Sequence, residues 1–154
     1  MRSILKTATT VLAVAAALVL APETGTAQNT TPLNAQNGIA LHGYDPVAYQ
    51  TDNKPVKGNE TYTAVFEGVT YRFANRTNME KFKASPAAYA PAYGGYCAYG
   101  VAVGGKYDID PAAFTVVKGT LYMNKNLSVR KKWLEDVPGN IEKADKNWPT
   151  VRNK

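Results

Sequence analysis

The segment 62–73, Tyr-Thr-Ala-Val-Phe-Glu-Gly-Val-Thr-Tyr-Arg-Phe, decides the fold class of this 154-residue chain. β-Branched and aromatic residues fill both halves of the segment, and these residue types are enriched in strands. Gly68 separates the halves and supplies the conformational freedom that a tight turn between antiparallel strands needs. The pattern therefore predicts a β-hairpin with strands over 62–67 and 69–73.

Three other segments place Asp or Ser before Pro and end on an aromatic residue: 45–49, 85–89 and 110–114. An Asp or Ser side chain accepts hydrogen bonds from the free N–H groups of a helix start, and Pro is tolerated at the first helical position. We expect each segment to be a short capped helical turn. The closing aromatic residue of each turn is expected to be mostly buried.

The remaining pattern adds one more hairpin and several helices. A hairpin is predicted over 114–117 and 120–123, and Thr77 begins a capping-box sequence that predicts a helix start. Towards the C-terminus, two short amphipathic helices are predicted, with a break at Pro138-Gly139. The expected architecture is α+β, with small antiparallel β-hairpins covered by several short helices in a single domain.

The first 27 residues have the pattern of a removable signal peptide. Arg2 and Lys6 precede an apolar run at 11–21, and small residues precede the expected cleavage after Ala27. The run is shorter than the roughly 20 apolar residues that span a bilayer. We therefore expect a periplasmic or secreted protein that begins near Gln28 and has no membrane span once the signal is removed.

The mature chain divides into three expected parts. Residues 28–38 are polar and predict a loose N-terminal arm, 39–148 form the domain, and 149–154 form a C-terminal tail. Without Arg2, Lys6 and Glu23 the chain keeps 16 basic and 11 acidic residues, a net charge of +5. The basic residues are dispersed, so no nucleic-acid binding is predicted.

Cys97 is the only cysteine and lies in the glycine-rich segment 93–100, Tyr-Gly-Gly-Tyr-Cys-Ala-Tyr-Gly. In an oxidising compartment a single cysteine is free, metal-bound or paired with another molecule. A free cysteine is also often a small buried apolar residue. The sequence leaves open whether Cys97 is a reactive thiol or part of the core.

His42, the only histidine, is the expected partner of Cys97. A thiolate and an imidazole suit copper or zinc, and they are also a nucleophile and its base. A third ligand could come from Tyr44, Asp45, Asp108, Met79 or Met123. We expect His42 and Cys97 to meet at one partly exposed site, because both lie in irregular, glycine-flanked segments.

Five motifs follow one another along most of the mature chain: Gly43-Tyr-Asp-Pro-Val-Ala-Tyr49, Tyr71-Arg-Phe-Ala-Asn75, Glu80-Lys-Phe82, Ser85-Pro-Ala-Ala-Tyr89 and Gly94-Gly-Tyr-Cys-Ala98. Together they resemble the exported branch of the YHS-domain family, a heavy-metal-associated, TRASH-like domain. The resemblance covers about residues 39–148 and implies a relation to small metal-associated modules.

The resemblance does not carry the family's ligands into this chain. Metal-binding members have a cysteine after Asp-Pro-Val and a Cys-x-x-x-Cys stretch after the Tyr-x-Phe strand. The matching positions here are Ala48, Ala74, Thr77 and Asn78. None of these is a soft ligand, so only Cys97 and His42 are left as candidates.

Three functions follow from these residues. The first, which we rank highest, is a periplasmic metal-binding protein that holds copper or zinc through Cys97 and His42, with Tyr44 and Asp45 as further candidate ligands. The second is a thiol-based redox protein or enzyme in which Cys97 is the catalytic thiolate and His42 lowers its pKa or moves a proton. The third is a non-catalytic binding module. The expected partner is a metal ion or an unidentified periplasmic molecule.

Overall fold

The hairpin expected over residues 62–73 is the centre of a four-stranded sheet in the computed structural model, which describes residues 32–154. The predicted signal peptide lies outside the described residues. The strands are β1 (Ala35–Gln36), β2 (Ile39–Ala40), β3 (Asn59–Phe66) and β4 (Val69–Phe73), in the order β1-β2-β4-β3. β3 and β4 pair antiparallel as expected, and β2 runs parallel to β4. Val69, Tyr71 and Phe73 are buried because alternate side chains of β4 face the core.

Short helices surround this sheet: η1 (Leu41–Gly43), α1 (Pro46–Thr51), α2 (Arg76–Ala84) and α3 (Pro86–Tyr89). Phe82 of α2 is fully buried, with its ring centroid 4.8 Å from that of Tyr71 and 5.1 Å from that of Phe73. The N-cap of α2 is Asn75, whose side chain accepts from Asn78 N–H. The capping box expected at Thr77 is therefore wrong, because Asn75 starts the helix two residues earlier.

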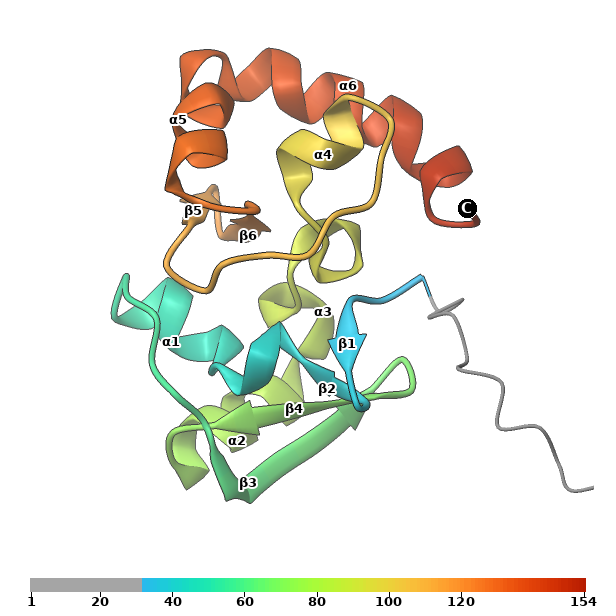
Figure 1. Ribbon diagram of the computed structural model, residues 1–154. Helices are drawn as coiled ribbons and strands as arrows, with labels where there is room; N and C mark the ends of the chain where they lie inside the picture. The colour runs from blue at the N-terminus through green and yellow to red at the C-terminus, as the bar shows by residue number, and fades with distance from the viewer. Residues whose placement is uncertain (1–31) are drawn as a thin grey trace, which may run out of the picture.

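The C-terminal half contains η2 (Ala92–Gly95), α4 (Ala98–Ala102), β5 (Phe114–Val117), β6 (Thr120–Met123), α5 (Leu127–Glu135) and α6 (Val137–Val151). Figure 1 shows the four-stranded sheet at one end of the molecule and α4, α5 and α6 at the other. The predicted β5–β6 hairpin is confirmed. Leu121 and Met123 pack in the core of the first half, whereas Tyr122 packs with Trp133 in the core of the second. Alternate side chains of β6 thus pack into two different cores. The predicted α+β class is confirmed.

The three expected capped turns have three different outcomes. Asp45 caps α1, and Tyr49 is fully buried, as predicted. Ser85 precedes α3 but makes no capping hydrogen bond through its side chain. The segment after Asp110 forms a turn in place of a helix, because Phe114 already belongs to β5 and pairs with Met123. The closing aromatic residues of the last two segments, Tyr89 and Phe114, are partly buried and pack against the core of the first half.

The boundaries of the folded domain differ from those expected from the sequence. The segment predicted as a loose arm contains β1 and the buried Leu33, Asn34 and Ala35, so residues 33–38 belong to the fold. The predicted tail is helical to Val151, the last residue of α6, whose side chain is buried in the core of the second half.

The C-terminal helices divide earlier than the sequence suggested. α5 and α6 separate at Asp136, which caps α6, and Pro138 and Gly139 lie inside the first turn of that helix, where Pro is tolerated. No helix within residues 32–154 is long and apolar enough to cross a bilayer.

Candidate functional site

His42 lies in a left-handed turn that ordinary residues avoid. The φ angles of Leu41, His42 and Gly43 are +51°, +52° and +79°. An L-residue in this region costs roughly 1–2 kcal/mol, and only glycine adopts it freely. The turn is held from both sides, because the Leu41 side chain is buried in the core and Lys57 Nζ donates to the His42 carbonyl at 2.8 Å. Backbone strain of this kind is concentrated at functional sites.

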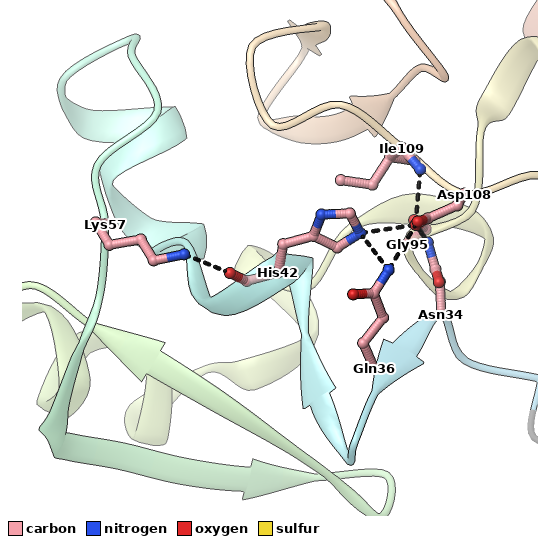
Figure 2. A network of polar contacts seen from close by, with 7 residues as sticks. All are labelled: Asn34, Gln36, His42, Lys57, Gly95, Asp108 and Ile109. Carbon is pink, nitrogen blue, oxygen red and sulfur yellow. Dashed lines mark hydrogen bonds and ion pairs between the residues drawn. The ribbon is translucent and has the colours of Figure 1, made fainter.

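The His42 ring is bound to the carboxylate of Asp108, 66 residues away in the sequence (Figure 2). His42 Nε2 lies 2.8 Å from Asp108 Oδ1, and Asn34 Nδ2 and the Ile109 N–H donate to the same oxygen at 2.9 and 2.8 Å. Gln36 Nε2 donates to Asp108 Oδ2 at 2.8 Å. Asp108 therefore joins strand β1, the left-handed turn and the loop that follows α4.

This arrangement favours the ionised form of Asp108 and determines which nitrogen of the His42 ring faces it. Burial alone would raise the pKa of Asp108, but the hydrogen bonds from Asn34, His42 and the Ile109 N–H outweigh burial and hold that pKa below its ordinary value. An ionised Asp108 accepts a proton-bearing Nε2, so the neutral ring carries its lone pair on Nδ1. Figure 2 shows Nδ1 directed away from Asp108. The carboxylate thus fixes both the orientation and the tautomer of His42.

A second left-handed turn is tied to the same network. Tyr93, Gly94 and Gly95 have φ angles of +53°, +60° and +79°. Asn34 N–H donates to Gly94 O at 2.7 Å, and Asn34 Nδ2 lies 3.2 Å from Gly95 O as well as 2.9 Å from Asp108. A Cβ on Gly94 would clash with the Pro32 carbonyl oxygen, so this position requires glycine. Asn34 therefore links the two strained turns.

A cavity of about 400 Å³ opens beside His42, and we call it the His42 pocket. It is lined by Gln36, Asn37, Ile39, His42 and Arg72. Arg72 pairs with Glu60 at 3.0 Å, but Glu60 is 81% exposed. A Cβ on Gly43 would lie 3.5 Å from Arg72 Cδ and 3.8 Å from Lys57 Nζ. Arg72, which lines the pocket, and Lys57, which does not, thus both lie next to the His42 turn.

Cys97 lies in a different cavity from His42. Its side chain is buried, with only 1% of the residue exposed, and it caps α4 by accepting from Gly100 N–H, with Sγ 3.3 Å from that nitrogen. Burial raises the pKa of the Cys97 thiol, and the N–H groups of Gly100, Lys125 and Tyr99 offset this only in part. The expectation of a partly exposed thiol is therefore wrong, because Cys97 belongs to the core of the first half.

The two further candidate ligands are already used for other purposes. Asp45 is fully buried, and its carboxylate accepts from the N–H groups of Val47, Ala48 and Ala74 and from Asn78 Nδ2. The ring of Tyr44 lies under Lys57 Nζ, 4.6 Å from its centroid, where a metal ion would meet a resident cation. Both assignments as metal ligands are thus in conflict with the packing.

The donor set does not fit the metal that the YHS resemblance implies. Within residues 32–154, no group of three or more His, Cys, Asp or Glu side chains is placed to hold a metal ion. Two of the family's ligand positions are occupied by Ala48 and Asn78, and the Asn78 amide donates to Asp45. The described residues therefore supply no metal cage.

Sequence reasoning named Asp108 only as a possible third ligand and missed Asn34, Gln36 and Arg72. The available signal in the sequence is the single histidine followed by Gly43, because a glycine at such a place often indicates a backbone conformation that other residues avoid. The partners lie too far along the chain to be paired by spacing.

The chain matches no protein-family model, no curated protein and no solved structure. The class of site is therefore defined by its own geometry, as a polar pocket on a small α+β domain that is lined by one histidine and one arginine.

Proposed function

We propose that this protein is a non-catalytic binding module that captures a small anionic molecule in the His42 pocket. The observation that carries the proposal is the convergence of His42, Arg72 and Lys57 around one left-handed turn beside a cavity of about 400 Å³. Ligand pockets in proteins commonly have volumes of about 300–1,000 Å³.

The charges of the pocket favour an anion. An Arg guanidinium matches the geometry of a carboxylate or phosphate and can bind it through two parallel hydrogen bonds. Glu60 occupies only one nitrogen of Arg72 in an exposed pair, and such pairs contribute little stability, so a ligand can replace it. The side-chain amide of Asn37 supplies a further donor in the same lining.

The same features favour binding over catalysis and over metal capture. Asp108 orients His42 as an acidic residue orients the histidine of a catalytic triad. However, no Ser, Thr, Cys or Lys side chain that could act as the nucleophile lines the His42 pocket. A metal cation would be repelled by Arg72, which lines the pocket. This proposal therefore adopts the third of the functions considered from the sequence, in place of a copper or zinc site.

The location of the module is part of the proposal. The N-terminal charge and apolar pattern supports export to the periplasm or the medium. The motifs shared with exported YHS domains support the same placement.

Binding of small acids to the purified protein tests the proposal. Isothermal titration at pH 6 with inorganic phosphate, succinate and citrate should detect binding of at least one of them. Arg72→Gln should weaken that binding about tenfold or more, because hydrogen bonds to charged groups are among the strong ones. Arg76→Gln, an exposed arginine at the start of α2, is the matched control and should bind like the unaltered protein.

Two results would contradict anion capture. One is the absence of binding by all three probes. The other is equal binding by the Arg72 and Arg76 variants, which would place the ligand elsewhere.

A further inference from the structure

Residues 103–107, Val-Gly-Gly-Lys-Tyr, belong to the loop between α4 and β5 and display two apolar side chains. Val103 is 62% exposed and Tyr107 is 46% exposed. The N–H groups of Val103, Gly104 and Gly105 all donate to carbonyls of α4, with N···O distances of 2.9 to 3.2 Å. The loop is therefore fixed in place and needs no ordering before it contacts another surface.

Three cations gather where this loop lies beside the C-terminal end of α6 (Figure 1). Lys106 Nζ donates to the Arg152 carbonyl at 3.4 Å. Lys154 Nζ donates to the Gly104 carbonyl at 3.1 Å. The basic residues are dispersed along the sequence, but the fold brings these three to one part of the surface.

Two packed aromatic rings hold the charges of Lys106 and Arg152 in place. Lys106 Nζ lies 5.3 Å from the centroid of the Tyr96 ring. The Arg152 guanidinium carbon lies 5.8 Å from the centroid of the Trp148 ring, and the two ring centroids are 6.5 Å apart. Because cations are attracted to the faces of aromatic rings, both charges stay close together without an acidic partner.

Acidic side chains do not neutralise this group of cations. None of the ion pairs among residues 32–154 involves Lys106, Arg152 or Lys154. Asp108 directly follows the loop, but its carboxylate is already bound to His42. The three positive charges can therefore attract an anion from outside the chain.

The net charge of the protein is concentrated in the same part of the chain. Residues 103–154 contain ten basic and six acidic side chains, whereas residues 32–102 contain six and five. Lys125 adds a further cation beside the loop, because its Nζ lies 5.3 Å from the centroid of the Tyr107 ring. A negatively charged surface would therefore attract this part of the molecule first.

We propose that the protein docks on an anionic phospholipid bilayer through this loop and the end of α6. We call the contacting residues the loop–α6 patch: Val103, Lys106, Tyr107, Arg152 and Lys154. Lysine and arginine side chains beside a bilayer attract its negative headgroups, whereas apolar and tyrosine side chains enter the boundary between headgroups and acyl chains. A partner that offered charge alone would leave Val103 in water, so the mixture of side chains favours a bilayer. The patch shares no residue with the His42 pocket, so docking does not depend on anion capture there.

Sedimentation with phospholipid vesicles tests the proposal. The protein used begins at Gln28, which keeps every described residue and removes the apolar run at 11–21 that would itself bind lipid. We expect it to sediment with phosphatidylcholine vesicles that contain about one third phosphatidylglycerol, and not with vesicles of phosphatidylcholine alone. Raising the salt concentration to about 0.5 M should release the protein, because salt screens exposed charges.

Two double variants separate the patch from the net charge. Lys106→Gln combined with Arg152→Gln should lower the partition coefficient about twentyfold, at about fivefold for each charge lost near the bilayer. Lys54→Gln combined with Lys81→Gln is the matched control, because it removes the same charge from exposed positions in the first half. This control should keep most of the binding.

Two valine variants test the apolar contact. Val103→Ser should weaken binding about threefold, because the side chain would no longer leave water favourably. Val65→Ser changes a valine of β3 that is 72% exposed, and it should bind like the unaltered protein. Equal binding by these two variants would overturn the insertion of the loop.

Three further results would overturn docking on a bilayer. The first is no sedimentation with the phosphatidylglycerol vesicles. The second is an equal loss of binding in the two double variants, which would reduce the effect to net charge. The third is binding to polyglutamate without binding to vesicles, which would assign the cations to an acidic protein partner.

Discussion

Replacing Asp45 with alanine removes one fully buried carboxylate that several donors share. Two of the donors are N–H groups in the first turn of α1, and loss of such a cap costs about 1 kcal/mol. The other two, Ala74 N–H at 2.9 Å and Asn78 Nδ2 at 2.7 Å, would lose this partner inside the protein. Each such loss costs about 1–3 kcal/mol, so we expect Asp45→Ala to lower the free energy of unfolding by about 3 to 7 kcal/mol.

Urea unfolding followed by tryptophan fluorescence measures this change. Asp110→Ala is the matched control, because half-buried Asp110 accepts from only one N–H, that of Ala112. Its expected cost is below about 1 kcal/mol. A similar small loss in both variants, with an unchanged dependence on urea concentration, would refute the assignment of Asp45 as a structural anchor.

Three more expectations concern the core, acid stability and processing. Tyr49→Ala should cost about 3 to 5 kcal/mol in the same assay, because the ring is fully buried, and Tyr89→Ala clearly less; equal losses would contradict the packing. The pKa of Asp108 is lower in the folded state than its ordinary value, so its contribution to stability is complete above that ordinary value and is lost as the pH falls through the folded value. Urea unfolding from pH 6 to pH 2 should therefore show a steeper acid loss in the unaltered protein than in Asp108→Asn, and identical slopes would speak against the network. Intact mass of the exported protein should place its first residue near Gln28; a full-length chain in the membrane fraction would exclude the predicted cleavage.

Both hairpins could be predicted because their information is local. The strands of the first hairpin are joined by Glu67-Gly68, and those of the second by Lys118-Gly119, so pairing follows from turn chemistry and residue type. The helical turn expected over 110–114 forms only as a non-helical turn for a tertiary reason, since the pairing of Phe114 with Met123 takes the aromatic residue into a strand. Asp110 still accepts from the Ala112 N–H, but the strand pairing prevents a helix from following this turn.

The candidate site could be predicted only in part. His42 was identified, because a single histidine before a glycine is conspicuous in the sequence. The expected pairing of His42 with Cys97 rested on side-chain chemistry alone. The fold instead brings Asp108 to the imidazole, from 66 residues away in the sequence. Neither the spacing nor the residue types of Asn34 and Gln36 predict that their side chains also donate to the Asp108 carboxylate.

The position of Asn34 limits how far the chain can be shortened at its N-terminus. Trimming that stops at Gln28 leaves the segment complete. An exopeptidase, or an expression clone that begins at Ala35, would remove the amide that donates to both Gly95 O and Asp108. The left-handed turn at Gly94 would lose its backbone partner at the same time, since Asn34 N–H donates to it. Limited proteolysis of this short stretch would therefore disable the pocket without cutting a single residue that lines it.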